Sequence, residues 1–228
     1  MRRSLLPQFI SLLALAARAM AQESEPFKMP TWQDEIGKGF VPYHQLKVDD
    51  FKIDDKGHPQ AGYWIKPFIH PYWHFIYTRK DWYYAYVDQW VIYSGLDKNE
   101  SSRHSKTPDM EKRLPHVQAY LDLNEICARQ LAALKPGELP SGRGATPEEA
   151  RNALYQNIDA ILKARYKALE DEAEQFQKAT EHGANMKKVR ELAKAIRKRL
   201  DALPAPAGPS ANELPVPSPS PTVSAKTP

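Results

Sequence analysis

The pattern of apolar and polar positions predicts strands in the first half of the folded region. Residues 39–97 are rich in aromatic and β-branched side chains and are punctuated by Pro, Gly and Asp. Within them, residues 68–78 and 83–93 have high strand propensity, with a plausible turn at residues 79–81 between them. We expect a shorter strand over residues 43–51. The pattern therefore predicts an antiparallel hairpin with at least one further strand.

The second half changes to the period of an amphipathic helix. Apolar positions recur on one helical face over residues 114–134, and a loop rich in Pro and Gly follows. Thr146-Pro147-Glu148-Glu149 then combines a capping threonine, a proline at the first helical position and a glutamate three residues after the cap. An apolar stripe continues to residue 176 and resumes over residues 189–200, after an interruption at His182-Gly183.

Strands followed by helices indicate an α+β fold. We expect N-terminal antiparallel strands, then the helix over residues 114–134, then a long C-terminal helical hairpin or broken helix. The folded region, residues 28–203, is long enough for a single domain with a sizeable core.

Both ends of the sequence differ in composition from this region. Arg2 and Arg3 precede an apolar stretch over residues 5–17, and small residues follow at positions 19 and 21, which is the pattern of a secretion signal. The stretch is too short for a permanent membrane anchor. Residues 204–228 are rich in Pro and Ser and are expected to be extended and disordered, as a tail or a ligand for a proline-binding module. We expect residues 1–21 to be removed and the protein to be exported, either periplasmic or secreted.

Charge and cysteine content narrow the functional classes. The formal net charge is +4, but Arg2, Arg3 and Arg18 lie in the expected signal, which leaves 29 basic residues against 28 acidic ones. So balanced a chain gives no reason to expect a nucleic-acid partner. The single cysteine, Cys127, excludes an intrachain disulfide and is expected to be a buried small residue.

Three short motifs carry a resemblance to a known family. The helix contains His116-Val117-Gln118-Ala119-Tyr120-Leu121-Asp122 and then Glu125-Ile126-Cys127-Ala128-Arg129-Gln130-Leu131; downstream is Thr180-Glu181-His182-Gly183, and upstream is the segment from Tyr43 to Phe51. These segments resemble a family of bacterial exported proteins of uncharacterised function that are predicted to be zinc-dependent proteases. The corresponding family patterns are H-E-Q-x-H-x-D, E-x-x-A-R-x-L, T-x-H-G and an opening L…DF. The resemblance covers about residues 39–200 and implies a zincin-like fold.

The departures from the family pattern concern catalysis. In a zincin helix, two histidines four residues apart share a zinc ion, and the glutamate after the first is the general base. Here His116 is retained, but Val117 occupies the base position and Tyr120 the position of the second ligand. Losing a general base alone should cost about 10²–10⁴-fold in rate. We therefore expect an inactive homologue without a cofactor.

In this interpretation, the remaining motif residues are vestigial. The resemblance implies that His116 and His182 are former metal ligands. It also implies that Gln118 and Asp122 remain as binding residues of a cleft that could still hold a peptide or protein. The chain would then act, if at all, by binding or scaffolding.

Two alternatives remain open. One is an active metallopeptidase whose zinc is held by His116, Tyr120 and His182, with Glu125 or Glu181 as the base. The other is that both histidines are ordinary polar residues and the resemblance is coincidental. The inactive homologue and the active metallopeptidase both require His116 and His182 to lie close together in space. A coincidental resemblance does not require it.

Other candidates are weaker. His70 and His74 lie four residues apart in an expected strand, about 13 Å from each other, and cannot share one metal ion. The many tryptophans and tyrosines could stack on sugars or peptides, but core packing and cross-strand pairing are the expected roles.

Overall fold

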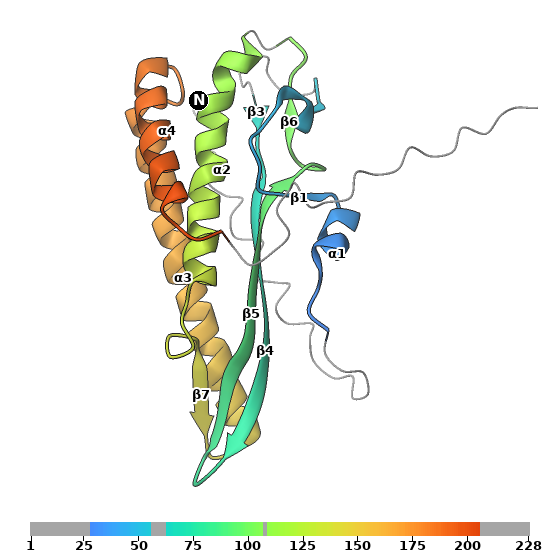
Figure 1. The fold of residues 1–228 in the computed structure, drawn as a ribbon, viewed down its shortest axis with the longest axis vertical. Helices are drawn as coiled ribbons and strands as arrows, with labels where there is room; N and C mark the ends of the chain where they lie inside the picture. Colours follow the sequence, from blue (N-terminus) through green and yellow to red (C-terminus); the bar gives the residue numbers. More distant parts are fainter. Residues whose placement is uncertain (1–27, 56–62, 107–108, 206–228) are drawn as a thin grey trace, which may run out of the picture.

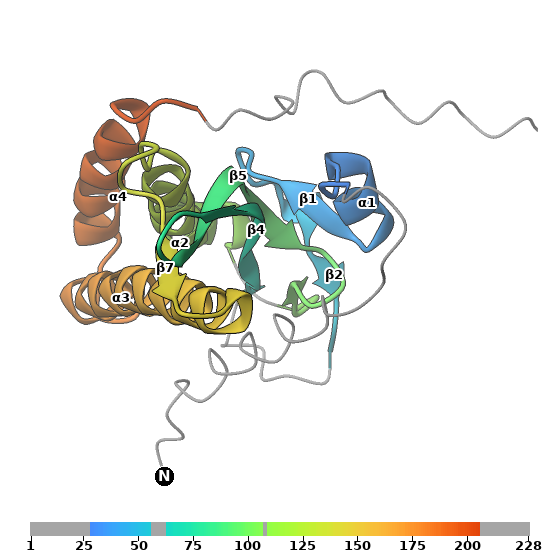
Figure 2. The ribbon, with the colours of Figure 1, turned by 90° about the horizontal axis from the view of Figure 1, so that it is seen from below.

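A computed structural model describes residues 28–55, 63–106 and 109–205. A long hairpin-based sheet lies beside three helices, α2 (Met110–Ala132), α3 (Pro147–Ala179) and α4 (Met186–Asp201) (Figure 1). A short helix, α1 (Trp32–Gly37), lies on the other side of the sheet (Figure 2). The expected α+β class is confirmed, and the strands precede the long helices except for one short strand between α2 and α3. None of the helices among these residues has the length and apolar character needed to span a bilayer.

The main sheet is built on β4 (Pro67–Arg79) and β5 (Tyr83–Asp97), which form the expected antiparallel hairpin. Both flanking strands pair with β5: β1 (Phe40–Pro42) with its end, and β7 (Ser141–Gly144) with its beginning. A small second sheet places β6 (Ser102–Arg103) between β2 (Lys52–Ile53) and β3 (Tyr63–Trp64).

A bulge in β5 keeps one side of the hairpin facing the helices along its whole length. The register skips Asp88 between the partners of His74 and Phe75. Because side chains alternate between the two faces of a strand, Trp90 and Val87 would otherwise point in opposite directions. With the extra residue, both pack in the same apolar cluster against α3.

The prediction of a strand over residues 43–51 is wrong. The chain turns there through a 3₁₀ segment, η3 (Val48–Asp50). The carboxylate of Asp50 accepts hydrogen bonds from the backbone N–H of Lys47 at 2.7 Å and from His44 Nε2 at 2.9 Å. These local bonds stabilise a turn in place of a strand ladder.

The segment between α2 and α3, expected to be only a loop, contains β7. Gly142 in this strand has no room for a side chain, because an added Cβ would lie 2.0 Å from the carbonyl oxygen of Ala150 and 2.3 Å from the N atom of Leu154. Both atoms belong to the backbone of α3, which therefore packs directly against β7. The predicted capped start of α3 is confirmed, since Thr146 Oγ1 accepts from the Glu149 N–H at 3.2 Å.

We predict that Gly142→Ala lowers the free energy of unfolding by about 1–3 kcal/mol, because the new methyl group cannot be accommodated without a backbone shift. Urea denaturation followed by circular dichroism measures this change. Gly137→Ala, in the same connection, is the matched control, since no atom lies within 4 Å of its added Cβ. Equal effects of the two substitutions would contradict the close packing of β7 on α3.

Candidate functional site

Helix α2 is the central element of the candidate site, because it contacts the sheet and both of the other long helices (Figure 1). His116 lies on its side toward α3, where its ring stacks on Phe176 with centroids 5.3 Å apart. The ring of Tyr120 meets that of His116 edge-on, also at 5.3 Å. His116 Nε2 and the Tyr120 hydroxyl are both buried without a hydrogen-bond partner. The side chain of Gln177 is the polar group beside the Tyr120 hydroxyl.

The turn between α3 and α4 packs against His116. Glu181, His182 and Gly183 have φ angles of 52°, 55° and 87°, so the turn passes through the left-handed region at three successive residues. A Cβ on Gly183 would lie 3.1–3.2 Å from atoms of the His116 ring. The His182–Gly183 segment and His116 are thus neighbours in space despite their separation in sequence, while the His182 side chain is exposed.

The electrostatic environment of this group favours neutral side chains. Burial, with a smaller contribution from the charges of His182 and Arg113, lowers the pKa of His116 to about 4. Burial likewise raises the pKa of Tyr120 to about 12. At neutral pH the site therefore offers an uncharged imidazole and an uncharged phenol.

These residues do not fit a zinc ion. A catalytic zinc site needs three ligands drawn from imidazole, thiolate and carboxylate groups, plus an open position for water. The described part of the chain contains no group of three or more His, Cys, Asp or Glu residues that could hold a metal ion. In addition, Phe176 covers one face of the His116 ring, and Gly183 lies so near that an added Cβ would be 3.1–3.2 Å from Nδ1, Cε1 and Cγ of the ring.

The position expected for the general base is part of the hydrophobic core. Val117 is 6% exposed and packs in a cluster with Leu121 of α2 and Leu96 of β5. The cluster also contains Leu46 and Phe51, so it joins α2 to the segment around η3. Val117 therefore contributes apolar packing between α2 and the sheet.

Gln118 connects α2 to the segment before η3. Its Oε1 accepts from the backbone N–H of Leu46 at 2.7 Å and from Gln45 Nε2 at 3.1 Å, while its Nε2 donates to Asp122 Oδ1 at 2.7 Å. The same Nε2 donates to the carbonyl oxygen of His44 at 3.3 Å. Both ends of the Gln118 amide are thus engaged within the protein.

Asp122 extends this network to α4. Its Oδ1 accepts from the Tyr43 hydroxyl at 2.7 Å and pairs with Arg197 at 3.4 Å. Arg197 also donates to the Tyr43 hydroxyl. Gln118 and Asp122 thus hold three parts of the fold together, and their expected place in a binding cleft stays a prediction.

The two alternative general bases, Glu125 and Glu181, do not lie in the apolar surroundings of the His116 ring. Glu125 is nine residues beyond His116 on the same helix, about 13 Å along its axis. It is 2% exposed and accepts hydrogen bonds from Arg129 Nε at 2.9 Å and from Ser94 Oγ. Burial raises the pKa of Glu125, and these two donors offset the increase only in part. Glu181 is exposed on the turn before α4.

A buried carboxylate that the sequence reasoning did not single out anchors α1 to β4. Glu35 is fully buried and accepts from His70 Nδ1 at 2.6 Å, from the Tyr72 hydroxyl at 2.9 Å and from Lys38 Nζ at 2.8 Å. Thr31 and Asp34 form a capping box that could have identified α1 from the sequence. His70 and His74 both lie on β4, and they are held by different carboxylates, Glu35 and Asp88.

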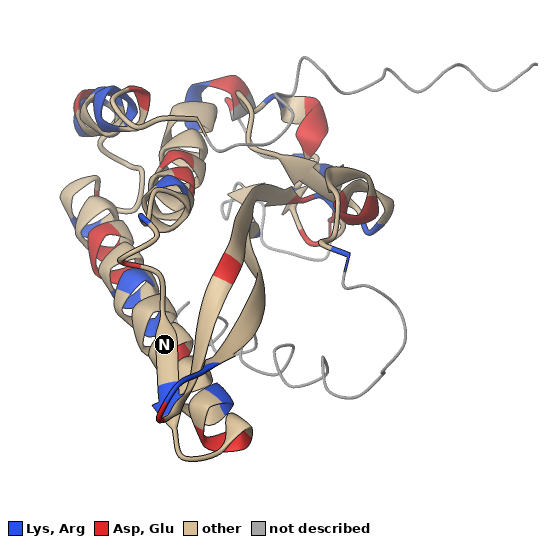
Figure 3. Ribbon diagram, turned by 60° about the horizontal axis from the view of Figure 1, so that its bottom comes forward, with Lys and Arg blue, Asp and Glu red and all other residues tan. Residues whose placement is uncertain are grey.

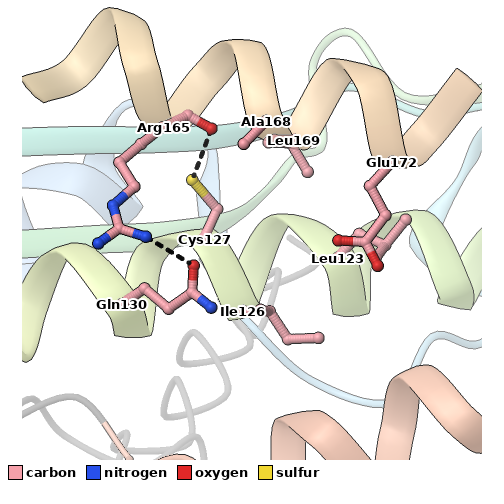
Figure 4. A pocket seen from close by; sticks show the side chains of 8 residues that line it. All are labelled: Leu123, Ile126, Cys127, Gln130, Arg165, Ala168, Leu169 and Glu172. Carbon is pink, nitrogen blue, oxygen red and sulfur yellow. Dashed lines mark hydrogen bonds between the residues drawn. The ribbon is translucent and has the colours of Figure 1, made fainter.

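Two hollows occur among the described residues, and neither is lined by the candidate site residues His116, Gln118, Tyr120, Asp122 or His182. One is a cavity of about 40 Å³ between α2 and α3 (Figure 4), lined by Leu123, Ile126, Cys127, Gln130, Arg165, Ala168, Leu169 and Glu172. The other, about 570 Å³, is an open hollow lined by residues of α4 alone. Cys127 is buried, as expected, and burial raises the pKa of its thiol to about 11.

We predict that His116→Phe flattens the pH dependence of stability between pH 6.5 and pH 4. The folded chain keeps His116 neutral down to about pH 4, whereas an unfolded histidine binds a proton near 6.5. Unfolding therefore takes up a proton in this window, and stability falls as pH falls. Phenylalanine has no proton to bind and can keep the stack on Phe176. Urea denaturation at half-unit pH steps measures the slope.

His182→Asn is the control for this experiment, because asparagine tolerates the left-handed conformation of that residue. It should keep most of the slope, since burial rather than the charge of His182 is the larger cause of the pKa shift. A parental slope in His116→Phe would show that His116 is not the titrating group.

Comparisons with protein-family models, with curated proteins and with solved structures found no match. The functional interpretation therefore depends on the geometry described above.

Proposed function

We propose that this chain is an exported, non-catalytic relative of the zinc-dependent protease family whose motifs it resembles, and that it acts by binding or scaffolding. The observation that carries this proposal is the engagement of the motif positions inside the protein. Val117 belongs to the core, and Gln118 and Asp122 use their polar atoms to join α2 to neighbouring segments.

Metal-assisted peptide hydrolysis requires a water molecule activated by a metal ion and a base that takes its proton. A valine at the base position cannot accept a proton. Glu125, the next glutamate along α2, lies about 13 Å from His116 along the helix axis and is paired with Arg129. This distance and pairing support a function without hydrolysis.

The second candidate function is a metallopeptidase with the atypical ligand set His116, Tyr120 and His182. It is supported by the two buried polar atoms without partners, His116 Nε2 and the Tyr120 hydroxyl, which a ligand could satisfy. The high pKa of Tyr120 argues against it, because a protonated phenol is a poor zinc ligand.

Hydrolysis of a mixed peptide library, followed by mass spectrometry with and without a zinc chelator, separates the two candidates. We expect no chelator-sensitive cleavage by the chain from Gln22 to Pro228. His116→Ala is the matched variant, because it removes a ligand that the metallopeptidase would need. Cleavage that is lost both with the chelator and in His116→Ala would overturn the proposal in favour of the enzyme.

A further inference from the structure

The face of the main sheet that points away from α2 and α3 is covered at only one end. Near the beginning of β4, α1 and β1 cover it through a cluster of Trp32, Phe68 and Tyr93 with Phe40 beside it. Toward the β4–β5 turn, none of the described elements packs on this face (Figures 1 and 2). The hairpin thus extends beyond its cover on this side.

The uncovered part carries large apolar side chains. Ile76 and Tyr86 are cross-strand partners, and Tyr84 follows on the same face. Arg143 of β7 pairs with Tyr84 in the ladder and places its guanidinium 4.4 Å from the ring of Trp82 and 5.8 Å from that of Tyr84. We call this surface the aromatic face. Its apolar members and their exposed fractions are Ile76 (37%), Trp82 (40%), Tyr84 (36%) and Tyr86 (36%).

The aromatic face is not needed for the core. The other side of the same hairpin packs Phe75, Ala85 and Val87 against α3. The residues of the aromatic face therefore remain exposed in the described domain, although contiguous exposed apolar side chains often mark an interaction site. The nearby turn projects beyond the helices (Figure 1) and carries Arg79 and Lys80, so that this end of the hairpin is basic (Figure 3).

We propose that the proline-rich segment of this chain, residues 206–228, docks on the aromatic face of the same molecule. Four prolines alternate with other residues in Pro215-Val216-Pro217-Ser218-Pro219-Ser220-Pro221. Such a sequence favours the polyproline II conformation, whose free carbonyl groups and flat rings suit surfaces lined by Trp and Tyr. Arg143, the tyrosine hydroxyls and the Trp82 indole N–H provide donors for those carbonyls.

The position of the last described residues makes this docking possible. Arg129 donates to the carbonyl oxygen of Leu203 at 3.1 Å and to Glu125, which in turn accepts from Ser94 of β5. The end of α4 is therefore anchored at the level of Ser94. From there to Tyr84, β5 extends for ten residues, about 33 Å.

The length of the segment matches this distance. From Ala205 to Pro215 the chain has ten residues, which would span about 31 Å as a polyproline II helix, and the sixteen residues to Pro221 would span about 50 Å in the same conformation. Measured from Ala205, the alternating prolines would therefore reach the distance at which the aromatic face lies. Because the tether is short, the same molecule supplies a high effective concentration of this segment. This inference does not depend on the proposed function or on the state of the α2 motif.

Paramagnetic relaxation tests the proposal in the chain from Gln22 to Pro228. A nitroxide attached to Thr222→Cys should broaden the amide signals of Tyr84, Tyr86 and Ile76 to a small fraction of their intensity in the reduced sample. The native Cys127 is buried, and its high thiol pKa protects it from labelling. Signals of α4 residues such as Lys194, on the far side of the helix layer, should keep their intensity.

Replacing all four prolines at 215, 217, 219 and 221 with serine should restore the signals of the aromatic face without touching the described domain. The matched change on the surface combines Tyr84→Ser with Tyr86→Ser. It should likewise restore the amide signal of Ile76 in the spin-labelled chain. No broadening in the labelled parent, or broadening that persists in the serine variant of the tail, would overturn the proposal. Broadening found only between labelled and isotope-labelled molecules in a mixture would also overturn it and assign the face to a second copy.

Discussion

Arg129→Ala should lower the free energy of unfolding by about 3–5 kcal/mol, which is the usual cost of removing one partner of a buried ion pair. The substitution leaves Glu125, which is 2% exposed, with only Ser94 as a donor. It also removes the bonds from Arg129 to the carbonyl oxygens of Leu200 and Leu203, which hold the end of α4 to α2. Chemical denaturation of the parent and the variant gives the difference directly.

Arg165→Ala is the matched control, because Arg165 is also partly buried but donates to the neutral amide of Gln130 at 3.3 Å. Its loss should cost about 1 kcal/mol, as for an ordinary hydrogen bond. Adding Glu125→Gln to Arg129→Ala should recover part of the loss, since no buried charge then remains unpaired. If Arg129→Ala and Arg165→Ala lower the free energy of unfolding equally, Arg129 does not stabilise the contact between α2 and the end of α4.

Glu35→Ala is expected to have a similarly large effect, about 3–5 kcal/mol, because it removes a buried carboxylate and leaves its donors unpaired. His70 and Tyr72 of β4 would lose their acceptor, and α1 would lose its polar attachment to the sheet. The matched control is Glu100→Ala, which removes an exposed carboxylate paired with Lys66 at 3.6 Å and should change stability little.

The same residue gives stability a specific dependence on pH. Burial alone would raise the pKa of Glu35, but hydrogen bonds from His70, Lys38 and Tyr72 outweigh it and lower that pKa to about 2. Since an unfolded glutamate has a pKa near 4.5, folding gains stability above pH 4.5 and loses it as pH falls toward 2. The loss should be absent in Glu35→Gln. A parental acid transition in that variant would assign the titration to other groups.

The pH ranges in which Glu35 and His116 change the stability of the fold adjoin each other, but they have different physical causes. His116 is held neutral by burial and destabilises the fold once pH falls below 6.5, whereas Glu35 is held charged by its donors and matters only below 4.5. The two variants therefore remove different parts of one pH profile.

The sequence predicted those parts of the fold that depend on local signals. The β4–β5 hairpin follows from the strand propensity of its aromatic and β-branched residues, the start of α3 from the cap at Thr146, and the break before α4 from Gly183. It did not predict β7, because Ser141–Gly144 has the composition of a loop and becomes a strand only by pairing with β5. The turn at η3 was missed because its bonds from Asp50 are specific to that geometry.

The position of the candidate site was predictable from the sequence, but the contacts of its residues were not. Spacing on a helix placed His116 and Tyr120 on one face, and their rings do meet. That Gln118 and Asp122 would bind backbone and Arg197 depends on the tertiary path of residues 43–46 and of α4, which no local pattern encodes. Glu35 was missed for the same reason, since a glutamate on a short helix ordinarily faces solvent.

The central claim is that the α2 motif holds no metal ion. Elemental mass spectrometry of the untagged chain from Gln22 to Pro228, purified in the presence of zinc, tests it most directly. We predict no zinc above the level found in His116→Ala. Zinc near one ion per chain in the parent, and lost in both His116→Ala and His182→Ala, would contradict the claim and identify a rebuilt metal centre around Tyr120.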